Sequence, residues 1–349
     1  MIRRAVRNNW RAGVEVEVAP SSGYRQMRAR PHWPLGRSRS ERGAALANVR
    51  AQSDALCRGR LQSAAMTPHA TIGLIHRLCD AILRAERAGL ARASILPALE
   101  SSRELHAESR FLRRLQDWPR GYPGDFETIE QLCEAQISAT DPLVRSLEWY
   151  ALNTPVAQQH RNKVEQQTAL IAETSRRKPN AEILLVGCGG CRDLRALEPP
   201  SLLESARVTL NDSDPEAIDF ARSRLPRGLR CQVEVGNALR VVPRLSRKSR
   251  YDLIIAGGIF DYLPDSAATL LLRHGYRALA PGGVLFFTNI AQGNPYRPWM
   301  EYLVDWVLLE RSADDLGRLL DGAEVPSSSV RFSRDLTELT FLIRVERSA

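Results

Sequence analysis

The sequence predicts an α/β protein in which a doubly wound, mostly parallel sheet of seven strands follows an all-helical region. Three observations support this fold class. From residue 182 onward, short apolar runs alternate with helical patterns, as expected of a parallel sheet with helices on both faces. The first apolar run ends abruptly in a glycine-rich turn. Residues 67–178, which precede that run, carry only helical periodicity.

The region before the glycine turn is expected to consist of helices. Ile72, Ile75 and Leu78 recur at helical spacing, which marks an amphipathic helix. Further helices are expected over 95–115, 126–137, 142–150 and 158–177, with a non-helical insert at 118–125. We interpret residues 66–178 as a lid that caps a substrate site and residues 179–349 as the ligand-binding domain.

The alternating region is expected to supply the whole sheet. Its strands are predicted at 183–186, 207–210, 230–235, 252–256, 284–288, 328–333 and 339–345, with helices between them that include 215–224 and 266–279. In sheets of this kind, ligands bind at the carboxyl ends of the strands. The functional residues are therefore expected in the loops that follow the strands.

Residues 1–65 differ in composition from the rest of the chain. They contain thirteen arginines and four acidic residues, which gives them a charge of +9, equal to the formal net charge of the whole chain. They show little apolar periodicity and are rich in Arg, Ser, Gly and Pro. We interpret them as a disordered Arg-rich tail, as a transit-type peptide, or as sequence upstream of a true start at Met66. On each interpretation they take no part in the chemistry.

The composition argues against several classes of protein. Residues 66–349 carry no net charge, so the high pI is no argument for nucleic-acid binding. The chain has no run of about 18 uncharged apolar residues, so no membrane insertion is expected. Cys188 and Cys191 form a C-x-x-C without a second pair, so no metal ion is expected. We expect a cytoplasmic protein with a small-molecule substrate, and a homodimer is an open alternative to a monomer.

A set of residues follows the first four strands in the order that a nucleotide-type cofactor needs. Gly187, Gly189 and Gly190 let the backbone approach a ligand closely, and the helix after them offers free N–H groups. Asp212 ends the second strand about 20 residues later, where a carboxylate is placed to accept ribose hydroxyls. Further cofactor contacts are expected from Ser213, Asn237, Ala238 and Gly257, with the Asn237 amide reading an adenine edge.

Over residues 180–348, this ordered set resembles the class I S-adenosyl-L-methionine (SAM) dependent methyltransferases. The glycine turn, the pattern Asp212-x-x-Pro215 and the Ala-Pro-Gly-Gly turn at 280–283 stand in the order of that family. The resemblance implies a Rossmann-like sheet and SAM as the cofactor. It also implies that the glycine turn approaches the methionine end of SAM, that Asp212 holds the ribose, and that the residue after the third strand meets the adenine.

Two positions depart from the pattern of that family. Leu185 lies where an acidic residue is usual, and Cys191 lies where a third glycine is common. The methionine amino group of SAM therefore needs another anchor, for which we consider the helical lid. The same departures leave open a catalytically inactive SAM-binding subunit. A NAD-binding Rossmann domain is disfavoured, because Arg192 stands where the last glycine of G-x-G-x-x-G belongs.

Two longer motifs resemble a narrower group. Residues 120–125 (Arg-Gly-Tyr-Pro-Gly-Asp) and 294–306 (Asn-Pro-Tyr-Arg-Pro-Trp-Met-Glu-Tyr-Leu-Val-Asp-Trp) are similar to the bacterial family associated with synthesis of the quorum signal 3-hydroxypalmitic acid methyl ester. This resemblance implies methyl transfer to a small metabolite, such as a hydroxy fatty acid carboxylate or an intermediate of secondary metabolism. Other enzymes of this fold cyclise SAM to azetidine-2-carboxylate and release methylthioadenosine, and the sequence leaves that reaction open.

The catalytic candidates lie in two loops. A carboxylate acceptor attacks SAM without a base, whereas a hydroxyl or amine needs a proton acceptor. We select Tyr122 and Asp125 in the insert, and Asp261 and Tyr262 after the fourth strand. Each has a structural alternative, because Pro-Gly-Asp is ordinary turn chemistry and an aspartate such as Asp261 is also suited to cap the following helix.

Overall fold

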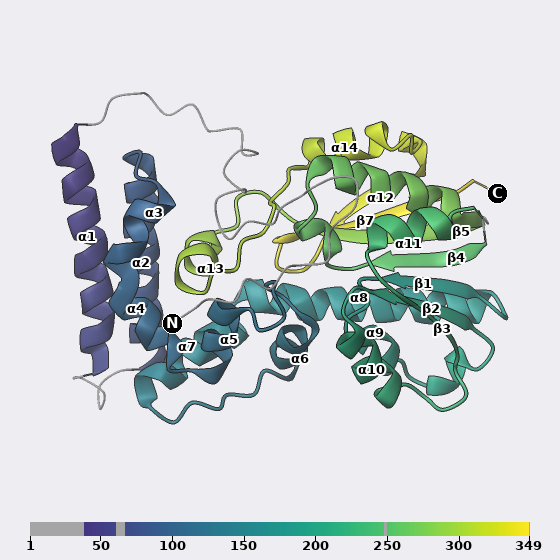
Figure 1. The fold of residues 1–349 in the computed structure, drawn as a ribbon, viewed down its shortest axis with the longest axis horizontal. Helices are drawn as coiled ribbons and strands as arrows, with labels where there is room; N and C mark the ends of the chain where they lie inside the picture. The colour runs from purple at the N-terminus through teal and green to yellow at the C-terminus, as the bar shows by residue number, and fades with distance from the viewer. Residues whose placement is uncertain (1–37, 61–66, 248–249, 349) are drawn as a thin grey trace. The chain divides into compact units, whose positions relative to one another are not determined.

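A computed structural model describes residues 38–60, 67–247 and 250–348. The chain divides into a helical unit and a sheet unit, whose elements are labelled in Figure 1. The helical unit comprises the chain up to Pro123, Ile137–Tyr150 and Pro298–Trp306, and the sheet unit comprises Gly124–Gln136, Ala151–Arg297 and the chain from Val307 onward. The chain therefore passes several times between the two units.

The sheet unit is built on a seven-stranded sheet with the strand order β3-β2-β1-β4-β5-β7-β6. Its strands are β1 (Glu182–Val186), β2 (Arg207–Asp212), β3 (Arg230–Val235), β4 (Tyr251–Ala256), β5 (Leu279–Ile290), β6 (Val330–Arg334) and β7 (Thr340–Glu346). Strands β1 to β5 are parallel, and β7 runs antiparallel to both β5 and β6. The predicted fold class, a doubly wound sheet of seven strands with a helical N-terminal region, is confirmed.

Helices cover both faces of this sheet (Figure 1). One face carries α8 (Pro155–Arg177), α9 (Arg192–Arg195) and α10 (Pro215–Arg224), and the other carries α11 (Ala238–Leu245), α12 (Asp265–Ala278) and α14 (Ala313–Gly322). Alternate residues of β1 point to opposite faces: Ile183 and Leu185 join the core under α8, and Leu184 and Val186 join the core under α12. Burial on both faces explains why β1 is a continuous apolar run.

The helical unit is assembled from short helices. It contains α1 (Arg39–Arg58), α2 (Pro68–Arg87), α3 (Arg92–Ile95), α4 (Glu100–Ala107), α5 (Arg110–Asp117), most of α7 (Pro142–Asn153) and most of α13 (Arg297–Leu303). The single helix expected over 95–115 is therefore wrong. A 3-10 turn at Leu96–Leu99 interrupts it, and the Ser109 hydroxyl accepts a hydrogen bond from Leu112 N at 3.2 Å, which starts α5 as a new helix.

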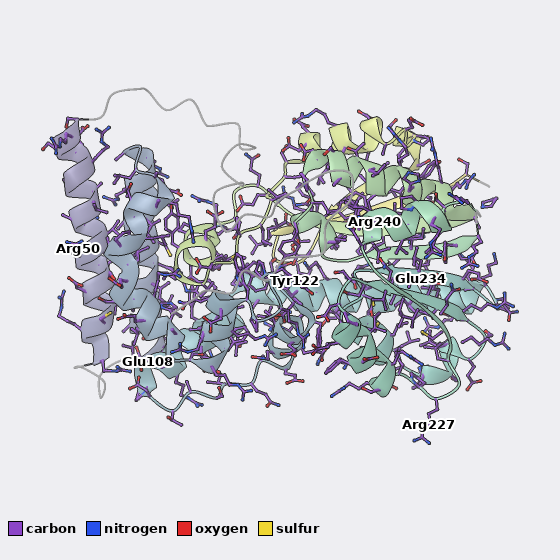
Figure 2. All side chains as sticks on the ribbon, in the orientation of Figure 1. Arg50, Glu108, Tyr122, Arg227, Glu234 and Arg240 are labelled. Carbon is purple, nitrogen blue, oxygen red and sulfur yellow. The ribbon has the colours of Figure 1, made fainter. Side chains whose placement is uncertain are left out.

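The predicted disorder of residues 1–65 is wrong for α1. Ser38 and Glu41 form a capping box at its start. Val49 and Leu56 are fully buried on its inner face, whereas Arg50, labelled in Figure 2, is exposed on its outer face. Because the apolar stripe of α1 is so narrow, the sequence of this helix shows little hydrophobic periodicity. Residues 1–37 and 61–65 lie outside the described residues, so that part of the interpretation stays a prediction.

The division expected between residues 178 and 179 differs from the two units of the structure. We expect helices α6 (Phe126–Glu134) and α8 in the lid, but both belong to the sheet unit. Leu170 of α8 shares a core with β1, and Glu130 of α6 pairs with two arginines of α9. Conversely, Pro298–Trp306 is expected in the ligand-binding domain but belongs to the helical unit. There Asp305 forms ion pairs with arginines of α3 and α4.

Candidate functional site

The glycine turn has the geometry that brings backbone close to a ligand. β1 ends at Val186, and Gly187 and Gly189 follow with φ angles of +62° and +52°, which favour glycine. The turn is joined to β2 by a hydrogen bond from Cys188 N to Asn211 O at 3.0 Å. A Cβ atom on Gly190 would lie 2.8 Å from Glu130 Oε1 and 3.0 Å from the ring of Phe220, so a side chain here would have to displace these neighbours. The turn is therefore both strained for other residues and closely packed.

Helix α6 packs against this turn. The Asp125 carboxylate accepts a hydrogen bond from Thr128 N at 2.9 Å and caps α6, and Asp125 is only 1% exposed. Phe126, the first residue of the helix, lies 3.4 Å from the position that a Cβ of Gly189 would take. Asp125 thus has a structural role as the N-cap of the helix that covers the turn, which differs from the turn-forming role considered as its structural alternative. Its catalytic role stays a prediction.

Tyr122 falls in a different unit from Asp125. It is half-buried and belongs to the helical unit, whereas Asp125 belongs to the sheet unit (Tyr122 is labelled in Figure 2). The predicted motif at 120–125 therefore straddles the point where the chain passes from one unit to the other. The catalytic role of Tyr122 also stays a prediction.

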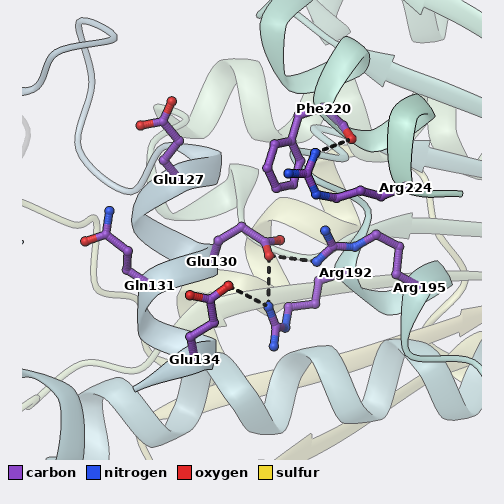
Figure 3. Close-up of a pocket in the computed structure, with 8 residues that line it drawn as sticks. All are labelled: Glu127, Glu130, Gln131, Glu134, Arg192, Arg195, Phe220 and Arg224. Atoms are coloured by element: carbon purple, nitrogen blue, oxygen red, sulfur yellow. Dashed lines mark hydrogen bonds and ion pairs between the residues drawn. The ribbon is translucent and has the colours of Figure 1, made fainter. Parts of the chain in front are cut away.

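A charged hollow of about 280 Å³ lies between α6, α9 and α10 (Figure 3). Glu130 accepts hydrogen bonds from Arg192 Nη1 at 2.8 Å and Arg195 Nη2 at 2.7 Å. The guanidinium groups of Arg195 and Arg224 lie over the ring of Phe220. None of the predicted site residues lines this hollow, and Glu130 is already paired with two arginines, so we assign the hollow a structural role in docking α6 beside the turn.

Asp212 lies at the end of β2 with its carboxylate against the glycine turn. It is 7% exposed, and it accepts hydrogen bonds from Gly189 N at 2.8 Å and Asp214 N at 3.0 Å. Burial raises the pKa of Asp212, and these backbone donors oppose the rise. A carboxylate has about four lone-pair sites, so Asp212 keeps acceptor capacity for a further donor such as a ribose hydroxyl. The structure thus joins the glycine turn to the acid after β2, a contact that was not predicted from the sequence, and the role of Asp212 in holding the ribose stays a prediction.

The remaining predicted cofactor residues lie along the same edge of the sheet. Asn237 follows β3, and its Oδ1 accepts a hydrogen bond from Leu239 N at 2.8 Å, which caps α11. Ala238 is buried behind it, whereas Ser213 is exposed after β2. Gly257 follows β4. It is packed so closely by α8 that a Cβ there would lie 2.0 Å from the side-chain amide nitrogen of Gln167.

Asp261 lies deep in the loop after β4. Its Oδ1 accepts a hydrogen bond from Ile290 N at 2.6 Å, and its backbone oxygen accepts one from Leu309 N at 2.8 Å. Its Oδ2 lies 3.7 Å from the ammonium nitrogen of Lys163 on α8. Burial raises the pKa of Asp261, and Lys163 opposes the rise. Asp261 does not begin α12, whose N-cap is Pro264, so the helix-capping alternative is not what the structure shows.

Two residues that organise this loop were not predicted from the sequence. Arg311, 4% exposed, donates to the backbone oxygens of Phe260 and Leu263, at 2.8 and 2.6 Å, and so holds the loop from behind. Lys163, also 4% exposed, lies on its other side. One feature of the sequence distinguishes Lys163: the chain has only three lysines, against 46 arginines. Tyr262, the remaining catalytic candidate, is half-buried beside them.

The comparisons with known proteins agree with this geometry. The methyltransferase domain family matches residues 183–283, which include the glycine turn, Asp212 and Asp261. A solved structure of a possible exported protein from Bordetella parapertussis is similar to the chain with a TM-score of 0.57, at 20% identity over 90% of this chain and 100% of that one. No curated protein sequence matches the chain.

Two solved methyltransferases are more distant. A SAM-dependent methyltransferase from Methanosarcina mazei is 18% identical over 49% of this chain and 94% of that one, with a TM-score of 0.38. Magnesium protoporphyrin IX methyltransferase from Synechocystis, solved with bound SAM, is 13% identical over 55% of this chain and 84% of that one, with a TM-score of 0.40.

Residues 183–283 are therefore similar to a methyltransferase domain, and the seven-stranded sheet is consistent with the Rossmann-like fold of SAM-dependent methyltransferases. The match to a methyltransferase domain indicates SAM as the cofactor. Across the described residues, no helix is long and apolar enough to cross a membrane.

Proposed function

We propose that the protein is a SAM-dependent methyltransferase that acts on a small metabolite. The observation that carries the proposal is the contact between Gly189 N and the Asp212 carboxylate, which joins the positive-φ glycine turn to the acid after β2. This arrangement fits SAM, because a close backbone approach suits its methionine end and a buried carboxylate with free lone pairs suits its ribose. When bound, SAM supplies an electrophilic carbon next to a sulfonium.

The protein's own task is then to position reactants and exclude water. Gly187–Gly190 and Asp212 would hold the cofactor, with Ser213, Asn237, Ala238 and Gly257 as the other proposed contacts. Asp261 would accept a proton from an acceptor that needs a base, and Tyr122, Asp125 and Tyr262 remain proposed catalytic residues. A carboxylate acceptor would need no base, so positioning would supply most of the rate enhancement.

The acceptor we propose is the carboxylate of a hydroxy fatty acid or of an intermediate of secondary metabolism. The support is the likeness of residues 120–125 and 294–306 to the family associated with 3-hydroxypalmitic acid methyl ester, which would place the enzyme in quorum signalling. We also propose a cytoplasmic location, which the six cysteines suit, since all are free in the structure. A homodimer stays an open prediction.

Cyclisation of SAM is the alternative reaction. A specific observation favours keeping it: Asp261 is a buried carboxylate with a raised pKa, which suits it to take a proton from an amine. A catalytically inactive SAM-binding subunit is the third alternative. The three differ in their products, so one experiment separates them.

The test is to incubate the full-length chain with SAM and identify the products by mass spectrometry. Methyl transfer predicts intact SAM without an acceptor, and S-adenosylhomocysteine with a methyl ester once a 3-hydroxy fatty acid is supplied. Methylthioadenosine formed without an acceptor would establish the cyclase instead. Intact SAM with every acceptor offered, together with measurable SAM binding, would favour the inactive subunit and contradict the proposed activity.

A further inference from the structure

A lysine–aspartate pair lies buried at the carboxyl end of β4. Lys163 Nζ and Asp261 Oδ2 are 3.7 Å apart, and the two side chains are 5% and 4% exposed. That separation is too long for a hydrogen bond, so the two charges face each other without direct contact. Two buried charges in imperfect contact are weak evidence for stability, because their desolvation cost can exceed their attraction. The pair therefore needs an explanation other than stability.

The pair lies beside the glycine turn. Asp261 closes a 3-10 turn whose first residue, Ile259, is 3.7 Å from the position that a Cβ of Gly187 would take. β1, which leads into the glycine turn, pairs with β4, which leads into the Asp261 turn. On α8, the side chain of Gln167, one turn after Lys163, packs on Gly257. All of these residues belong to the sheet unit.

Other charged groups near the pair are neutral or already engaged. Burial and the nearby Lys163 lower the pKa of His160 well below its usual range, so this imidazole is neutral at pH 7. Arg311 lies behind the loop and is engaged with Asp265 and the backbone oxygens of Phe260 and Leu263. Lys163 and Asp261 are thus a positive and a negative group that face each other at the carboxyl end of β4.

β1 supplies no acid to hold the amino group of a methionine arm. Leu185 occupies the usual acidic position, is 1% exposed, and packs in the apolar core under α8. The methionine arm of SAM carries one carboxylate and one ammonium. A facing pair of one ammonium and one carboxylate is the charge complement of that arm, and each ligand charge would then meet an opposite one.

We propose that Lys163 and Asp261 bind the amino-acid end of SAM, with Lys163 on its carboxylate and Asp261 on its ammonium. The inference rests on the proposed function, because it presupposes that SAM binds at this edge of the sheet. It assigns to α8 the anchoring role that an acidic residue of β1 usually has.

The test compares two ligands by calorimetry on the full-length protein. S-Adenosylhomocysteine carries the amino-acid end, and methylthioadenosine lacks it. In Lys163→Met, we expect the affinity for S-adenosylhomocysteine to fall at least tenfold, while that for methylthioadenosine stays within twofold. Asp261→Asn, which keeps an acceptor for Ile290 N, should give the same selective loss and serves if Lys163→Met does not fold.

Lys178→Met is the matched control, since Lys178 directly follows the same helix, lies at the other end of β4 and pairs with Asp252. It should change neither affinity. Equal weakening of the affinity for both ligands in Lys163→Met, or no weakening of either, would overturn the inference, whereas the proposed function would still stand. If the wild-type protein bound neither ligand, the proposed function would fall and this inference with it.

Discussion

Two lysine–aspartate pairs join α8 to β4 or to the loop after it, and they differ in almost every respect. At the amino end of β4, Lys178 Nζ lies 2.6 Å from Asp252 Oδ1, and the lysine side chain is 54% exposed. The second carboxylate oxygen accepts a hydrogen bond from Glu182 N at 2.9 Å. At the carboxyl end, Lys163 and Asp261 are both buried and 3.7 Å apart. The first pair is a satisfied structural contact, and the second is a pair of charges held apart.

The difference follows the polarity of a parallel sheet. Ligands bind beyond the carboxyl ends of such strands, and the amino ends are left to stability. Substitutions at the carboxyl end should therefore alter ligand binding, and substitutions at the amino end or in the helical unit should alter only stability. For each substitution below, a change in both ligand affinity and stability would contradict this separation.

The largest effect on stability is expected from His106 in the helical unit. Complete burial lowers its pKa to about 4, while Nδ1 contacts Ser102 O at 2.6 Å and Nε2 accepts a hydrogen bond from Trp299. Below pH 6.5, His106 is protonated in the unfolded chain but stays neutral in the folded protein. The free energy of unfolding therefore decreases as the pH falls from 6.5 towards 4. The loss attributable to His106 is about 3 kcal/mol.

Chemical denaturation of wild type and His106→Asn at several pH values measures this loss. The stability advantage of wild type over the variant should shrink by that amount between pH 7 and pH 4, and ligand affinity at pH 7 should not change. Asp193 acts in the opposite sense, because burial raises its pKa to about 6, but it is common to both proteins and cancels in the difference. A stability difference independent of pH would contradict the prediction.

A smaller loss is expected at the amino end of β4. Asp252→Ala leaves Glu182 N and Lys178 without their acceptor, which should lower the free energy of unfolding by about 2 kcal/mol. Lys178→Met removes only an exposed partner and should cost at most about 0.5 kcal/mol. Thermal and chemical unfolding measure both changes. Affinity for S-adenosylhomocysteine should be that of wild type in each variant, and a tenfold loss in either would break the comparison.

Much of the sheet could be predicted from the sequence, because its signals are local. Apolar runs and the turns that bound them lie within a few residues of each other, and so does the glycine turn with its positive φ angles. Asp212 could be predicted because it ends a strand, whose position follows from the same local pattern. The one large discrepancy in the strands is β5, which begins at Leu279 rather than near residue 284, since the Ala-Pro-Gly-Gly segment continues the strand.

The parts that could not be predicted depend on long-range contacts. Lys163 and Asp261 are 98 residues apart, and a lysine on a mostly polar helix is indistinguishable from a solvated one until the helix is docked. The packing of α6 on the glycine turn depends on Glu130 meeting two arginines of α9. The assignment of Pro298–Trp306 to the helical unit likewise depends on long-range contacts such as the ion pairs of Asp305, which no local sequence pattern reveals.

The central claim is that SAM binds where the glycine turn meets Asp212, and calorimetric titration of SAM into wild type and Asp212→Ala tests it most directly. Asp214→Ala is the control, because Asp214 caps the next helix through Glu216 N but faces no proposed ligand group. We predict binding to wild type and to Asp214→Ala. In Asp212→Ala, we predict an affinity about 100-fold weaker, as expected from losing hydrogen bonds to a charged acceptor. No binding to wild type, or equal affinity in Asp212→Ala, would contradict the account.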